Sequence, residues 1–103
     1  MNTAQFLKAL AETHRRKWTI SGGHVRIHTA RYYCCPITAV ANQRAGYWKY
    51  GVGDWARAAR AIGLPKAQAT RIIRAADSDL TAFPTLRAKL LAAVGFKPLE
   101  STR

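Results

Sequence analysis

Apolar residues near the start of the chain recur with a helical period. Phe6, Leu7 and Leu10 fall on one side of a helix. Thr3 precedes them and is of a type that caps a helix N-terminus. The pattern therefore predicts a first helix over residues 3–13.

The pattern then changes to strict alternation. Trp18 and Ile20 alternate with polar residues, as do Val25 and Ile27, and residues 21–23 (Ser-Gly-Gly) separate the two runs. This arrangement predicts a small antiparallel β-hairpin with one apolar face. The outward positions on its other, basic face are Lys17, Thr19, His24, Arg26 and His28.

The rest of the chain again has helical character. Further helices are expected over residues 36–46, 54–62, 66–77 and 84–95. Pro36 and Pro84 suit first-turn positions, while Gly46 and Gly95 suit helix ends. The segment between the first two of these helices is rich in aromatic residues and glycine. We expect it to be a loop that partly covers the core through Tyr47, Trp48 and Tyr50.

These elements predict an α+β fold that is mainly helical, with about five short helices and one small antiparallel hairpin. A chain of 103 residues fits one domain, and almost half of its residues are apolar. We expect a single compact basic domain over residues 1–97 and a frayed tail over residues 98–103. The sequence contains neither a signal-peptide pattern nor a long apolar run, so we expect no contact with a membrane.

Charge narrows the range of partners. Seventeen Lys and Arg against five Asp and Glu give a formal charge of +12. Residues 1–53 hold eight basic and one acidic residue, and residues 54–103 hold nine and four, so both halves are cationic. Such a field attracts polyanions, which predicts DNA, RNA or a nucleoprotein complex as partner. An acidic host protein surface and a surface charged only for solubility are the alternatives.

Residues 55–76 resemble a helix-turn-helix. Gly63 can supply the positive φ of the turn, and Ala59 is small where the second helix would cross the first. The apolar residues that would lock the two helices together are Ile62, Leu64, Ala69, Ile72 and Ile73.

The resemblance implies a DNA-reading surface on the second helix. Its outward residues would be Lys66, Gln68, Thr70, Arg71 and Arg74. Gln can bond adenine and Arg can bond guanine in the major groove, while Lys66 would meet a phosphate. Arg57 and Arg60 on the first helix would lie toward the DNA backbone. A plain packing corner is the alternative, which Pro65 and the small Ala67 at the start of the second helix favour.

A second basic region lies beside the hairpin. It combines cations with aromatic rings in the order His14, Arg15, Arg16, Lys17, Trp18, Arg26, Arg31, Tyr32 and Tyr33. Rings that stack on bases and cations that meet phosphates would suit single strands or RNA. The alternative places Trp18 in the core and leaves the cations solvated.

The two cysteines, Cys34 and Cys35, are adjacent and cannot form an unstrained disulfide, which favours a reducing compartment. Cys35 would lie near a helix N-terminus, where its pKa would fall, and His24, His28 and Asn42 could be drawn around it as an active site. Burial of both thiols as small apolar groups is the favoured interpretation. We therefore expect no enzyme and no catalytic residue.

Metal binding is also not expected. His24 and His28 would lie about 13 Å apart on one strand face. Paired cysteines in zinc sites are usually separated by two or more residues. The chain also lacks a glycine-rich phosphate loop, so we expect no metal and no cofactor.

Several segments together resemble small phage and prophage accessory proteins: W-T-I, G-G-H-V-R-I, C-C-P-I-T-A-V-A-N, A-A-R-A-I-G-L, I-I-R-A-A-D and L-R-A-K-L-L-A-A-V-G. The resemblance spans Phe6 to Gly95. It implies a viral protein in the cytoplasm of a bacterial host, acting by stoichiometric binding. Two functions follow: helix-turn-helix-like DNA reading, with a homodimer expected, or inhibition of host defence in the manner of anti-CRISPR proteins by docking on a host complex.

Overall fold

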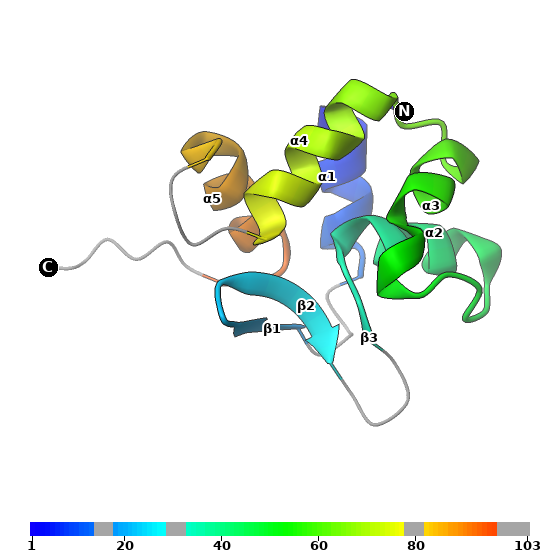
Figure 1. Cartoon of the computed structure of the whole chain (residues 1–103), viewed down its shortest axis with the longest axis horizontal. Helices are drawn as coiled ribbons and strands as arrows, with labels where there is room; N and C mark the ends of the chain where they lie inside the picture. The colour runs from blue at the N-terminus through cyan, green and yellow to red at the C-terminus, as the bar shows by residue number, and fades with distance from the viewer. Residues whose placement is uncertain (14–17, 29–32, 78–81, 97–103) are drawn as a thin grey trace, which may run out of the picture.

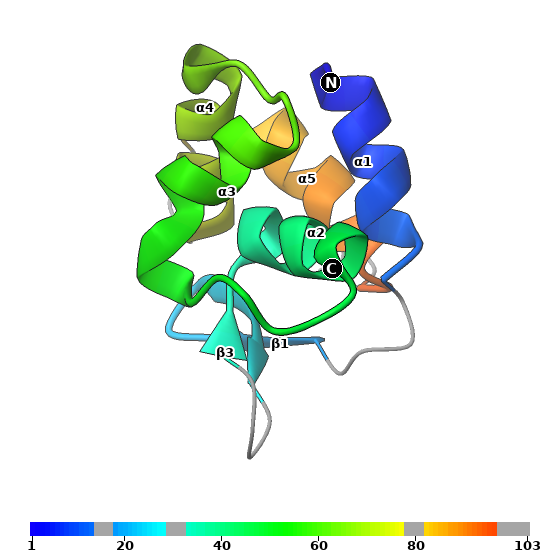
Figure 2. The same cartoon turned by 90° about the vertical axis from the view of Figure 1, so that its right-hand side faces the viewer.

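The computed structural model describes residues 1–13, 18–28, 33–77 and 82–96. These residues form a mainly helical α+β fold, which confirms the predicted class. Both views show the helices gathered on one side of a small sheet (Figure 1, Figure 2). The elements are α1 (Thr3–Ala11), β1 (Trp18–Ser21), β2 (His24–His28), β3 (Tyr33–Cys34), α2 (Pro36–Ala45), the 3-10 helix η1 (Val52–Asp54), α3 (Trp55–Ala61), α4 (Lys66–Asp77) and α5 (Pro84–Ala93). Within the described ranges, no helix has both the length and the apolar character that crossing a bilayer requires.

The predicted hairpin is present, and a third strand extends it. β1 pairs with β2 around the two-residue turn Gly22-Gly23, where both glycines have positive φ. β3 pairs antiparallel with the other edge of β2, with Ile27 opposite Cys34. A two-residue strand is too short to leave an alternating pattern in the sequence, so only the hairpin was predictable.

The first helix differs from its prediction at both ends. Asn2, rather than Thr3, is the N-cap: its Oδ1 accepts from the Gln5 amide at 2.8 Å. The Gln5 side chain accepts from the Asn2 amide in return, which completes a capping box. The helix ends at Ala11, two residues earlier than predicted.

The central element is α2, which packs against α1, α3, α4, β2 and β3. Figure 2 shows it in the middle of the helical layer, above the sheet. Pro36 and Gly46 delimit it as predicted, and Gly46 ends it in the left-handed conformation. The buried part is wider than the predicted apolar stripe, because every residue from Pro36 to Asn42 is buried. A helix that is buried on all sides must hold its own polar side chains in hydrogen bonds.

Asn42 meets this requirement by fixing the loop that follows α2. Its Nδ2 donates to the Tyr50 carbonyl, and its Oδ1 accepts from the amides of Lys49 and Tyr50. Tyr50 is buried, as the loop interpretation predicted, whereas Tyr47 and Trp48 are exposed. The aromatic loop therefore covers the core through one ring and presents the others outward.

Arg26 corrects the prediction of an outward basic face on the hairpin. It lies on β2 opposite the apolar side, yet it is 8% exposed because the end of α4 packs over it. Its Nη1 lies 2.5 Å from Asp77 Oδ1 at the last residue of α4. Burial alone would lower the pKa of Arg26, but the hydrogen bond and charge of Asp77 outweigh that effect and raise it.

Ile20 also departs from the predicted alternation, but here an apolar residue is exposed, whereas Arg26 is a basic residue that is buried. Ile20 was expected on the apolar face with Trp18 and Val25, yet it is 44% exposed. Trp18 is buried, and its indole Nε1 donates to Thr13 Oγ1 at 3.2 Å. β1 is an edge strand, and its apolar face is covered at Trp18 but not at Ile20.

Removal of the Asp77 carboxylate should destabilise the fold, because it leaves the Arg26 charge buried without a partner. We expect Asp77→Asn to lower the free energy of unfolding by about 2 kcal/mol, less than for fully buried pairs because Asp77 keeps contact with solvent. Denaturation in urea measures the loss. Glu12→Gln removes one exposed negative charge and serves as control.

The double variant Arg26→Met, Asp77→Asn should recover much of the lost stability, because no buried charge remains. Equal loss in the single and double variants would contradict the role given to the ion pair.

Candidate nucleic-acid interface on α3 and α4

The corner between α3 and α4 contains the glycine turn that the sequence predicts. Gly63 adopts the left-handed conformation, with φ 73°, and the Leu64 amide donates to the Ala59 carbonyl at 2.9 Å to close the end of α3. The residues that hold the corner, Ala59, Ile62, Leu64, Ala69 and Ile72, are buried and Ile73 is half-buried. The two helices also pack on α2, so α2, α3 and α4 contact one another pairwise (Figure 2).

Five cations project from the two helices of this corner. Arg57 and Arg60 on α3 are exposed, as are Lys66, Arg71 and Arg74 on α4. We call these five residues the α3–α4 cationic face.

The two acidic side chains that the structure describes at the ends of the α3–α4 pair have other partners. Asp54, before α3, accepts from the Gly51 amide through Oδ2. Asp77, at the end of α4, pairs with Arg26 and lies 3.5 Å from His24 Nδ1. Among the described residues, no salt bridge joins either carboxylate to one of the five cations, so the exposed surface of α3 and α4 keeps an excess of positive charge.

Gln68 does not take the outward position predicted for it. It is half-buried, and its Oε1 accepts from Thr3 Oγ1 of α1 at 3.1 Å. An α-helix has 3.6 residues per turn, so a spacing of three residues drifts around the helix axis. Gln68 consequently turns toward α1, while Arg71 and Arg74 stay on the exposed side. Thr70 is also half-buried, and its hydroxyl donates to the Lys66 carbonyl within the helix.

The two exposed arginines of α4 rest on an aromatic ring that the sequence did not single out. The guanidinium carbons of Arg71 and Arg74 lie 5.4 and 5.7 Å from the centroid of the Phe83 ring. Phe83 has φ 54°, the left-handed conformation, immediately before Pro84 and α5. Cation–π contacts of this kind restrict long side chains and hold their charges in place. The contact of Phe83 with the two arginines was hard to predict from the sequence, because a Phe before a Pro is common at the start of a helix.

A similar contact orients the α3 side of the face. The Arg57 guanidinium lies 5.6 Å from the centroid of the Tyr50 ring, and Lys49 Nζ lies 5.5 Å from the same centroid. Tyr50 is itself fixed by Asn42. The position of Arg57 therefore depends on the central helix α2.

The second basic region is described only in part. Arg15, Arg16 and Lys17, with His14, Arg31 and Tyr32, lie outside the described residues. Trp18 is buried, as its core interpretation predicted, and Tyr33 is exposed. Because Arg26 is buried and paired with Asp77, it is not available for a phosphate.

The cysteine pair lies in the core. Cys34 and Cys35 are 2% and 1% exposed and are both reduced, which confirms their prediction as buried small apolar groups. Burial raises the pKa of Cys35, against weaker opposing effects from Thr38 and Arg26. The pKa lowering predicted from the helix N-terminus is therefore wrong, because desolvation exceeds it.

Two polar residues near the thiol are held in hydrogen bonds of their own. Thr38 Oγ1 lies 3.4 Å from Cys35 Sγ and also accepts from the Cys35 amide. Asn42, considered as an orienting residue, is committed to the loop at Tyr50. Among the described residues, no three His, Cys, Asp or Glu side chains lie close enough to hold a metal ion together.

Both thiols should resist modification in the folded protein. A chromogenic disulfide reagent at neutral pH should label them slowly in native buffer and rapidly in denaturant, because the reactive thiolate is disfavoured by burial. Since its folded pKa is raised, Cys35 stabilises the fold below its unfolded pKa of about 8.5, and this contribution is lost as the pH rises above that value. Fast, stoichiometric labelling of the native protein would contradict this account.

Comparison of the chain with protein-family models, with curated proteins and with solved structures gave no match.

Proposed function

We propose that the protein binds nucleic acid through the α3–α4 cationic face and acts by stoichiometric binding rather than by catalysis. The observation that carries the proposal is the set of five exposed cations on two helices joined by a left-handed glycine turn, to which the described carboxylates Asp54 and Asp77 form no salt bridge. Phosphate neutralisation by such a set supplies most of the affinity for nucleic acid, whatever its sequence.

Duplex DNA is the ligand that fits the α3–α4 cationic face best. In the proposed complex, α4 approaches the major groove, with Arg71 and Arg74 near base edges. Ala67 precedes them on the exposed side and offers no base contact of its own. Arg57, Arg60 and Lys66 contact phosphates and position the helix without specifying sequence. Gln68 is left out of base recognition because it is bound to Thr3.

A homodimer belongs to this proposal. A single short helix seldom supplies enough specific affinity, and two copies would double the number of base and phosphate contacts. The reduced, adjacent cysteines fit a reducing compartment, and with the resemblance to phage accessory proteins we place this activity in the cytoplasm of a bacterial host.

Docking on a host protein complex remains a second candidate, in line with inhibition of host defence. The observation that favours it is the exposure of Tyr47 and Trp48, which are 61% and 36% exposed on the loop after α2. Tyr and Trp are enriched in protein interfaces, where their rings become buried.

Two single substitutions should separate base contacts from phosphate contacts. We expect Lys66→Ala to weaken binding to all duplex sequences alike and to reduce the slope of log affinity against log salt by about 1. We expect Arg71→Ala to relax the base preference at one position of a selected site, at a loss of about 1–3 kcal/mol there. Fluorescence anisotropy titrations against random and selected duplexes at several salt concentrations measure both effects.

Lys8→Ala is the matched control, because Lys8 is an exposed cation that lines a depression between α1 and α2. It should alter affinity less than Lys66→Ala. Unchanged binding in both test variants would eliminate the cationic face as the binding surface. A complex with a host protein that survives nuclease treatment, together with no affinity for DNA or RNA, would support docking on protein instead.

A further inference from the structure

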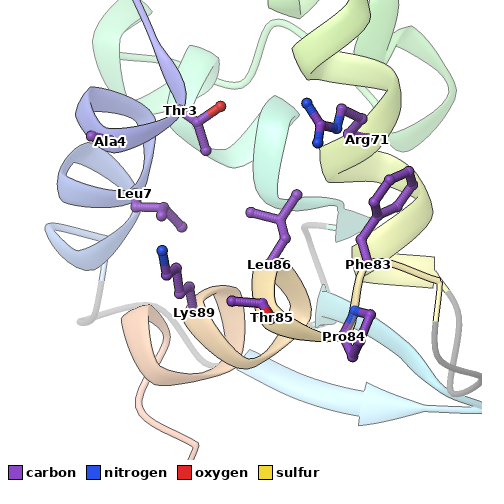
Figure 3. Close-up of a pocket in the computed structure, with 9 residues that line it drawn as sticks. All are labelled: Thr3, Ala4, Leu7, Arg71, Phe83, Pro84, Thr85, Leu86 and Lys89. Carbon is purple, nitrogen blue, oxygen red and sulfur yellow. The ribbon is translucent and has the colours of Figure 1, made fainter.

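An open depression of about 580 Å³ lies between α1, α4 and α5 (Figure 3). Leu7 and Leu86 point toward one another across it, with Arg71 and Lys89 on either side. The residues that line it are Thr3, Ala4, Leu7, Arg71, Phe83, Pro84, Thr85, Leu86 and Lys89. Its volume falls within the range of sites that hold small organic groups.

The lining combines apolar surface with positively charged side chains. Two of the nine lining residues are cations and none is acidic. Thr3 and Thr85 add hydroxyl groups. The complementary occupant is therefore a group with an apolar or aromatic body and an attached negative charge. A purely apolar group would leave the two cations without a counter-charge, and a purely anionic group would leave the apolar side chains in contact with water.

Arg71 connects this depression to the α3–α4 cationic face. It lines the depression, projects from α4 beside Arg74, and lies over the Phe83 ring. Phosphates that follow the cationic face would therefore reach the rim of the depression at Arg71. Unpaired bases commonly stack on aromatic rings or on arginine planes, and Phe83 with its arginines offers both.

We infer that the depression takes up one unpaired nucleotide of a bound strand, with its base against Leu7, Leu86 and Phe83 and its phosphate beside Lys89. This inference rests on the proposed nucleic-acid binding and adds a site for a single unpaired base. An acidic, apolar peptide has similar chemistry, but the continuity of the depression with the α4 cations favours the strand.

The test fills the depression without disturbing the core. Ala4 is exposed on α1 and lines the depression, so Ala4→Trp places a ring in it. Ala92→Trp adds the same ring at an exposed position of α5 outside the lining and serves as control. Each protein is titrated with a fully paired duplex and with the same duplex carrying one unpaired fluorescent adenine analogue. Circular dichroism checks that both variants fold.

The expected result for the wild type is tighter binding of the duplex with the unpaired analogue, together with a change in its fluorescence. Ala4→Trp should lose about tenfold in affinity for that duplex, the worth of one stacked base, and should keep its affinity for the paired duplex. Ala92→Trp should match the wild type on both.

Three outcomes would overturn the inference. If Ala4→Trp binds the unpaired analogue as the wild type does, the depression holds no base, although the proposed binding to duplex stands. If the wild type binds neither duplex, the proposed function fails as well. If Ala4→Trp leaves both affinities unchanged but abolishes binding of an acidic, leucine-rich peptide, the depression receives a protein segment.

Discussion

Burial of α2 on all sides is the constraint on which the rest of the structure depends. Five other elements contact this helix, and each polar side chain in its buried stretch has a partner. Thr38 bonds the Cys35 amide, and Asn42 fixes the backbone at Lys49 and Tyr50. Tyr50 in turn lies under Arg57. A central buried helix thereby sets the position of a surface charge through one amide and one ring.

The α4 helix is constrained at its C-terminal end. The Arg87 guanidinium of α5 donates to the carbonyls of Ala75 and Ala76, and Asp77 is bound by Arg26 of the sheet. The exposed side of α4 carries its arginines on Phe83. A recognition surface needs rigid support of this kind, because side chains held before binding lose less freedom when they bind.

Local sequence patterns predicted most of the elements, because their signals lie within a few residues. Pro36 and Gly46 delimited α2, Gly63 identified the turn, and the alternation around Gly22-Gly23 identified the hairpin. The candidate site was only partly predictable, since which side of α4 is exposed depends on its packing against α5 and on Thr3 of α1, which lies 65 residues from Gln68 in sequence.

Gln68 and Arg26 show how contacts that are distant in sequence limited the prediction of the site. Each looked like a free surface residue, and each has its partner more than fifty positions away: Thr3 for Gln68 and Asp77 for Arg26.

The positive charge of the protein also affects the stability of its fold. Nine exposed cations in the described part of the chain repel one another in the folded state, so their mutual repulsion opposes folding. In the proposed function, a polyanion bound to the folded form would relieve that repulsion and so act as a stabilising ligand of the fold.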